Sequence, residues 1–135
     1  MSTYKTLMFD LTGEIATITL NRPKLNLFNQ EMVEEVIQVC HSLKFNPSVR
    51  FVILAAAGKH FSGGFDLNVG EEEFTAEVAR VGQLAGHEMM RSLESLEQVT
   101  IAALQGVVIG AGMAVAMASK PVGTLKYTVG AISRR

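Results

Sequence analysis

The sequence is poor in several residue types, and each shortage excludes a class of protein. Cys40 is the only cysteine in 135 residues, so no disulfide can form within the chain and a reducing compartment is expected. Charged residues make up 19% and hydrophobic residues 48% of the chain, a composition that excludes intrinsic disorder. Twelve basic residues are balanced by thirteen acidic ones, and without a basic excess no nucleic-acid partner is expected. The length predicts a single domain.

Acidic residues are missing from the last part of the chain. All 13 lie in residues 1–97, whereas residues 98–135 carry four basic residues and no acid. This part contains the apolar run Ile101–Ala118, which approaches the length of a membrane span. Glycines and the Gln105-Gly106 pair divide the run, so a buried strand, a turn and a buried helix are predicted instead, with no membrane partner. No signal peptide is visible at the start, and a cytoplasmic location is expected.

Hydrophobic periodicity predicts an α/β fold with parallel strand pairing. Short β-rich segments are followed by alternating helical and strand patterns, and a continuous apolar strand is typical of a sheet covered on both faces. Asn29 and the pair Asn46-Pro47 mark the ends of the first helix. The predicted elements are a hairpin of residues 4–11 and 15–20, a helix of residues 30–44, a strand of residues 51–56, a long helix opened by residues 71–73 and a strand of residues 100–104.

The two helical patterns each have one apolar face. In the first, Cys40 shares that face with valines, isoleucine and leucine, which indicates a core residue and not a nucleophile. In the second, Glu71–Glu73 complement the helix dipole, so they are interpreted as a solvated helix start and no metal site is predicted. The apolar face of the second helix is expected to consist of Phe74, Val78, Val81, Ala85, Met89, Leu93 and Leu96.

Two glycine-containing segments follow predicted strands. We call Phe61–Leu67 the first glycine loop and Gln105–Gly112 the second glycine loop. Glycines permit close approach of a ligand to backbone N–H groups, and the start of a helix near Gly112 leaves free N–H groups. One N–H from each loop could hold a developing oxyanion. The alternative is that both loops serve only packing, since neither matches a dinucleotide or phosphate-loop motif.

The ordered motifs resemble the crotonase (enoyl-CoA hydratase/isomerase) family. They are Asn21-Arg22-Pro23, Asn26, the strand of residues 51–56, the segment FSGGFDL and the segment AALQGVVIGAG. The resemblance implies an incomplete, crotonase-like spiral of ββα units over residues 1–119. It also implies an acyl-CoA thioester as partner, no cofactor beyond coenzyme A, and a homo-oligomer (a trimer or dimer of trimers) for an intact parent.

The resemblance also implies roles for individual residues. Gly63 and Ala111 would be the two backbone donors of an oxyanion hole. Lys24 and Lys59 would contact coenzyme A phosphates, with a solvated surface position as the alternative for each. His60, His87 and Glu88 are interpreted as polar positions outside the chemistry. The remaining substrate-binding positions would be Gly64, Phe65, Gly110 and Gly112.

The sequence departs from the family pattern at the acid–base positions. The first glutamate of the hydratases falls on Ala114, and the second would fall near Arg134, where no acid exists. Residues 120–135 form a basic tail unlike the family, so the chain is expected to be the N-terminal portion of a longer enzyme. Isomerase-like or other single-base chemistry in that parent is one hypothesis. The other is a non-catalytic acyl-CoA-binding or interaction module.

Overall fold

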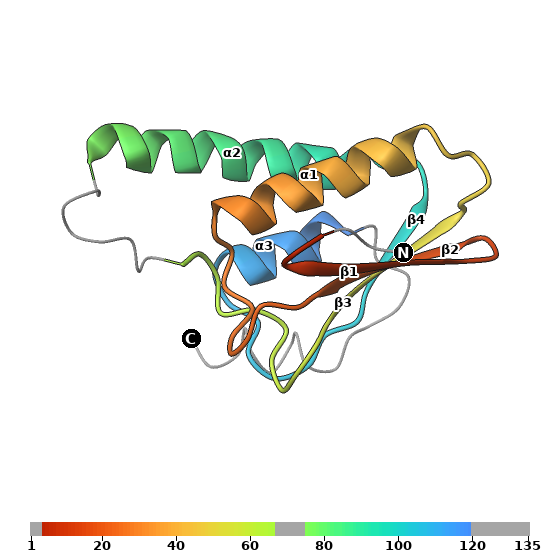
Figure 1. Ribbon diagram of the computed structural model, residues 1–135, viewed down its shortest axis with the longest axis horizontal. Helices are drawn as coiled ribbons and strands as arrows, with labels where there is room; N and C mark the ends of the chain where they lie inside the picture. Colours follow the sequence, from red (N-terminus) through yellow and green to blue (C-terminus); the bar gives the residue numbers. More distant parts are fainter. Residues whose placement is uncertain (1–3, 67–74, 120–135) are drawn as a thin grey trace.

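A computed structural model describes residues 4–66 and 75–119 of the chain. The segment order is strand, strand, helix, strand, helix, strand, helix (Figure 1). The bounds are β1 (Leu7–Thr12), β2 (Ile15–Leu20), α1 (Gln30–Lys44), β3 (Phe51–Ala56), α2 (Ala76–Glu94), β4 (Val99–Ala102) and α3 (Ala111–Ala118). The basic tail of residues 120–135 and the three glutamates of residues 71–73 lie outside the described residues.

One sheet organises the described residues, with the strand order β1-β2-β3-β4. The predicted hairpin is confirmed, since β1 pairs antiparallel with β2 through the turn at Gly13. The parallel pairing is also confirmed: β2 pairs with β3 and β3 with β4 in parallel register. Strands β2, β3 and β4 therefore all end at the same edge of the sheet, which is where both glycine loops begin.

Helix α1 forms where its sequence predicts it. The side chain of Asn29 accepts a hydrogen bond from the N–H of Met32 at 2.9 Å, which caps the helix start. The buried face of α1 includes Val36, Val39 and Cys40, at most 2% exposed. Burial raises the pKa of the Cys40 thiol to about 12, so the thiolate that a nucleophile needs does not form near neutral pH. The interpretation of Cys40 as a core residue is confirmed.

Helix α2 differs from the sequence-based expectation. It begins at Ala76 with Thr75 as its N-cap, whereas the predicted opening is at Glu71. Only its carboxyl-terminal half packs as predicted, with Met89 and Leu93 at most 1% exposed. Val78 and Val81, predicted on the buried face, are 45% and 54% exposed. The prediction is wrong there because this half of α2 projects beyond the start of α1 (Figure 1).

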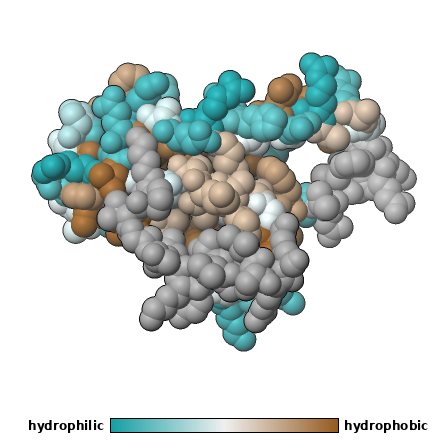
Figure 2. Space-filling model, turned by 180° about the vertical axis from the view of Figure 1, so that it is seen from behind, coloured by the Kyte–Doolittle hydropathy of each residue, from teal (hydrophilic) through white to brown (hydrophobic). Residues whose placement is uncertain are grey.

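The apolar run of residues 101–118 divides into two elements, as its glycines predict. Its first residues complete β4, which ends at Ala102, slightly earlier than expected, and its last residues form α3, with Gly110 as N-cap. Among the described residues, no helix combines the length and the hydropathy that crossing a membrane requires. Figure 2 shows apolar surface gathered at the centre of the rear face, below a hydrophilic upper rim.

Candidate functional site

The two glycine loops pair with each other beyond the ends of β3 and β4. Ser62 and Val108 form an isolated parallel bridge. Three backbone hydrogen bonds hold the loops together: the Phe61 N–H donates to Gln105 O at 2.8 Å, the Ser62 N–H to Val107 O at 3.1 Å, and the Ile109 N–H to Ser62 O at 3.2 Å. Segments that are far apart in the sequence thus form one backbone surface.

Glycine is required at the contact between these loops. Gly64 has a φ of +103°, and a Cβ placed on it would lie 3.6 Å from the Ala111 nitrogen. On Gly110, with φ of +55°, a Cβ would lie 3.6 Å from the Gly64 Cα. On Gly112, it would lie 2.7 Å from the Ser62 Cβ, a distance that real contacts do not reach. Gly64 and Gly110 therefore face each other, whereas Gly112 packs against Ser62.

Phe65 and Ala111 are among the residues at this junction whose backbone N–H has no acceptor among the described residues. Ala111 is the first residue of α3, where an N–H has no partner within the helix. Phe65 is held on one side only, since the Phe28 N–H donates to Gly64 O at 2.8 Å and the Asp66 N–H to Phe28 O at 2.9 Å. In such a parallel bridge the N–H of the middle residue, Phe65, points away from the partner strand.

The prediction that Gly63 offers a free N–H is wrong. This N–H donates to the carbonyl oxygen of Leu25 at 2.8 Å. A Cβ on Gly63 would lie 3.0 Å from a methyl carbon of Leu27. Gly63 therefore anchors the first glycine loop to residues 25–27, and its backbone donor is already used. Among the described residues of this loop, the donor that remains free belongs to Phe65.

A buried network of hydrogen bonds from Ser62 and Asn26 holds the first glycine loop in place. The Ser62 hydroxyl, fully buried, donates to Asn26 O at 2.8 Å and accepts from the Gly64 N–H at 3.1 Å. The side-chain nitrogen of Asn26 donates to Ala57 O at 3.0 Å and to His60 O at 2.9 Å. Fully satisfied networks of this kind hold one backbone arrangement. In the sequence, Asn26 is identified only as a motif position, because its partners Ala57 and His60 lie in a distant part of the chain.

An ion pair between Arg22 and Asp66 holds the carboxyl-terminal end of the same loop. Arg22 Nη2 lies 2.8 Å from Asp66 Oδ2, and both side chains are largely shielded from solvent. The Nη1 group of Arg22 donates to Leu27 O at 2.9 Å. Arg22 thus connects the residue after Phe65 to the residue before Phe28. The sequence alone indicates no role for the side chains of Arg22 and Asp66, although both residues belong to the ordered motifs.

The ring of Phe65 lies against α2. It is 43% exposed and contacts Phe28 in an edge-on arrangement with ring centroids 6.5 Å apart. A Cβ on Gly86 of α2 would lie 2.9 Å from the Phe65 Cζ atom. The ring therefore occupies the space that Gly86 leaves open. The exposed part of the ring adds apolar surface to the first glycine loop.

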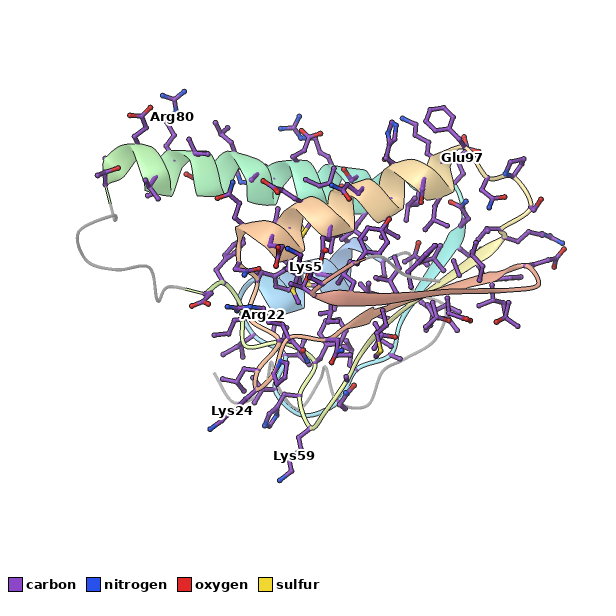
Figure 3. All side chains as sticks on the ribbon, viewed as in Figure 1. Lys5, Arg22, Lys24, Lys59, Arg80 and Glu97 are labelled. Atoms are coloured by element: carbon purple, nitrogen blue, oxygen red, sulfur yellow. The ribbon has the colours of Figure 1, made fainter. Side chains whose placement is uncertain are left out.

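The other predicted residues lie outside the glycine loops, although His60 contacts the second one. Lys24 and Lys59 are exposed, and Figure 3 shows both side chains reaching into solvent at the lower end of the molecule. His60, interpreted from the sequence as a polar position outside the chemistry, is half-buried, and its Nδ1 accepts the Val107 N–H at 3.0 Å. His87 and Glu88 on α2 are exposed, as interpreted from sequence.

Position 114 carries no proton-transfer group. Ala114 is exposed on α3, and its N–H donates to Gly110 O at 3.0 Å. In the described ranges, no cluster of three or more histidine, cysteine, aspartate or glutamate side chains could hold a metal ion. A groove of about 260 Å³ lies between α1 and α2 and is lined by His41, Lys44, Glu88 and Arg91 among others. None of the residues that line this groove belongs to the glycine loops.

Comparison with known proteins places the chain in one family. Residues 10–121 match the sequence profile of the enoyl-CoA hydratase/isomerase family. The short-chain-enoyl-CoA hydratase of Clostridium acetobutylicum is 38% identical over 107 residues, which are 78% of this chain and 41% of that protein. The 1,2-epoxyphenylacetyl-CoA isomerase of Escherichia coli is 32% identical over 107 residues, 76% of this chain and 41% of the isomerase.

Solved structures show the same fold. The enoyl-CoA hydratase of Bacillus anthracis superposes with a TM-score of 0.80 at 27% identity, covering 86% of this chain and 46% of that structure. The enoyl-CoA hydratase of Shewanella pealeana gives a TM-score of 0.81 at 29% identity, covering 87% and 46%. The fold is therefore the crotonase fold over about half of its length. The chain spans about two fifths of the curated relatives that it matches.

Proposed function

Since the chain belongs to the enoyl-CoA hydratase/isomerase family, we propose that it binds acyl-CoA thioesters and stabilises a thioester enolate. The two donors in this proposal are the backbone N–H groups of Phe65 and Ala111. The single observation that supports it is that these unpaired N–H groups lie on two loops so close that a Cβ on Gly64 would lie 3.6 Å from the Ala111 nitrogen.

This arrangement suits removal of a proton next to a thioester carbonyl. As the proton leaves, negative charge develops on the thioester oxygen, and fixed donors aimed at that oxygen lower the barrier without reorganising. A donor of this kind contributes about 3–4 kcal/mol in comparable acyl-transfer sites. Gly64 and Gly110 leave the backbone open to the substrate, and the exposed part of the Phe65 ring supports an apolar acyl group. Lys24 and Lys59 are proposed to meet coenzyme A phosphates as mobile charges.

The proposed reaction class is isomerase-like or other single-base chemistry in a protein that contains this chain. Hydration needs a positioned acid and base, and Ala114 supplies neither. No acid follows Glu97 in the sequence. We further propose a cytoplasmic homo-oligomer, with coenzyme A entering only as part of the substrate. A non-catalytic acyl-CoA-binding module is the second candidate, and the alanine at position 114 is the observation that favours it.

Ala111→Pro tests the proposed oxyanion hole. Proline is well tolerated at the first position of a helix, so this change removes one N–H donor with little cost to α3. Acetoacetyl-CoA, which forms a stable enolate, is titrated against butyryl-CoA, which does not. We expect Ala111→Pro to weaken acetoacetyl-CoA binding about 100-fold or more, while Ala111→Gly, which keeps the N–H, stays near wild type.

The same titrations contain the results that would reject the proposal. If the wild-type chain binds neither thioester, acyl-CoA binding by this chain is wrong. If Ala111→Pro retains the wild-type preference for acetoacetyl-CoA, the Ala111 N–H is not a donor to the thioester oxygen. Circular dichroism of each variant verifies that α3 and the sheet are intact.

A further inference from the structure

We infer that Arg22 is a positioning residue for the proposed site: through Asp66 and Leu27, it fixes the direction of the Phe65 N–H. The inference rests on the proposed function, because it assigns a task to the contacts behind one of the two proposed donors. Arg22 is located in the loop after β2, and its guanidinium reaches Asp66 in the first glycine loop.

The backbone of Phe65 is held through its two neighbours. Its two neighbours, Gly64 and Asp66, are both bonded to the backbone of Phe28, at 2.8 and 2.9 Å. These two bonds set the plane of the pairing, and the Phe65 N–H consequently points to the other side. A peptide held by two neutral bonds at its flanks can still rotate, and its N–H has no acceptor among the described residues that would hold it in place.

Arg22 braces both segments of this pairing. Its guanidinium bonds Asp66 Oδ2 at 2.8 Å and Leu27 O at 2.9 Å, so one rigid planar group spans residues 27 and 66. Bonds between guanidinium and carboxylate are shorter and stronger than neutral ones, and the planar fork restricts their direction. The Arg22 side chain is 31% exposed and the Asp66 side chain 17% exposed. Solvent therefore screens this ion pair less than it would screen a fully exposed one.

The backbone of Arg22 is itself fixed by hydrogen bonds to Asn26. The Arg22 N–H donates to Asn26 Oδ1 at 2.8 Å, and the Asn26 N–H donates back to Arg22 O at 2.9 Å. Asn26 is the residue that also holds Ala57 and His60. The brace is therefore connected to the buried network under the loop. Donors in an oxyanion hole need such supporting contacts, because small errors in direction reduce their effect.

The test reads the thioester carbonyl directly. Butyryl-CoA labelled with ¹³C at the carbonyl is bound to the chain, and its resonance moves downfield in proportion to the hydrogen bonding of its oxygen. We expect Arg22→Gln and Asp66→Asn each to remove half or more of the downfield displacement. Affinity for free coenzyme A, which lacks the acyl carbonyl, should stay within about threefold of wild type, since no proposed phosphate contact is changed.

Further variants separate this role from a general effect on stability. Arg22→Lys keeps the charge but not the planar fork, and it should restore only part of the displacement. The double variant Arg22→Gln with Asp66→Asn should be no worse than either single one, because each change removes the same ion pair. Arg50→Gln is the matched control, since the Arg50–Glu14 pair is exposed and 4.0 Å long; it should leave the resonance unchanged.

Two results would overturn the inference. Full displacement in folded Arg22→Gln would show that the brace does not direct the Phe65 N–H. Additive losses in the double variant would show that the two residues act separately. If Arg22→Gln does not fold, the nearly isosteric Asp66→Asn decides the matter alone. Absence of any displacement in the wild-type chain would instead reject the proposed function, which keeps the two failures distinct.

Discussion

At the scale of single residues, buried polar side chains decide how segments are joined. Glu35 is 8% exposed on α1, yet its carboxylate accepts hydrogen bonds from the Lys5 N–H at 2.7 Å and from the Thr6 N–H at 2.7 Å. The Thr6 hydroxyl also donates to it. This carboxylate ties the segment before β1 to the middle of α1. The apolar periodicity of the sequence predicts no polar residue on the buried face of this helix.

The pKa of Glu35 predicts how this tie depends on pH. Burial pushes the pKa of the carboxyl upward, but the hydrogen bonds from Thr6 and Lys5 and the charge of Lys5 outweigh burial and leave the pKa lowered. The stabilisation is therefore fully present above the ordinary glutamate pKa of about 4.3 and is lost as the pH falls through the lower folded-state value.

Glu35→Gln is expected to reduce the free energy of unfolding by about 1–3 kcal/mol at pH 7. The difference from wild type should shrink below about pH 4, because the protonated wild-type carboxyl then resembles the amide. Urea unfolding at several pH values measures both effects. A difference that stays constant into strongly acidic solution would show that the ionised form is not what Glu35 contributes.

Two glycines offer a matched pair of residue-scale tests. A Cβ on Gly112 would lie 2.7 Å from both the Cβ and the carbonyl oxygen of Ser62, whereas a Cβ on Gly82 of α2 would meet nothing within 4 Å. Gly112→Ala should destabilise the protein by about 1–3 kcal/mol through overpacking. Gly82→Ala should stabilise it by about 0.5–1 kcal/mol. Chemical unfolding midpoints that shift in the same direction would contradict this account of the loop junction.

At the scale of elements, α2 combines a buried and an unpartnered half. Met89 and Leu93 belong to the core, while Val78, Val81 and Leu84 are between 45% and 54% exposed. The helix has the apolar periodicity of a buried face, but the described residues place no neighbour against its amino-terminal half. An amphipathic pattern indicates which face of a helix could be buried, but it does not show that another element packs against that face.

Substitutions along α2 should therefore have unequal costs. Met89→Ala is expected to lower the free energy of unfolding by about 2–5 kcal/mol, because it leaves a cavity in the core. Leu84→Lys should change it by no more than about 0.5 kcal/mol, because that side chain is already 53% exposed. Denaturant titration of both variants gives the comparison. A cost for Leu84→Lys as large as that for Met89→Ala would show that this face is covered in solution.

At the scale of the whole molecule, the described elements form a core with the glycine loops at one edge. The sheet, α1 and the end of α2 enclose a continuous apolar core that includes Ile18, Leu54 and Met89, each 0% exposed. The glycine loops extend from the strand ends of this core. The chain spans about two fifths of its curated relatives, so most of each relative has no counterpart in this core.

The chain is expected not to hydrate crotonyl-CoA. Stabilising the enolate oxygen alone delivers no proton and activates no water, and position 114 is alanine. Absorbance of the conjugated thioester should stay at background when purified chain is added. A turnover near one per second, which is within the ordinary range of enzymes, would show that another residue performs the acid–base step. The Ala111→Pro variant would then serve as the control for the site.

The sequence by itself determined the features that depend on local patterns. Asn29 and the apolar spacing after it specify α1, the alternation around Gly13 specifies the hairpin, and the glycines of the run 101–118 specify a strand, a turn and a helix start. The free N–H of Ala111 is also a local property, because the first N–H groups of any helix lack a partner within it.

Only the tertiary structure decided which donor of the first glycine loop is free. Gly63 and Phe65 are equivalent loop positions in the sequence, but Leu25 accepts the N–H of Gly63, and Phe28 bonds the two neighbours of Phe65. These partners come from a segment much earlier in the chain. Side-chain and backbone pairing across such distances leaves no periodic signal, since it depends on where the sheet brings the loops together. For the same reason, the sequence could not show that half of α2 lacks a partner among the described residues.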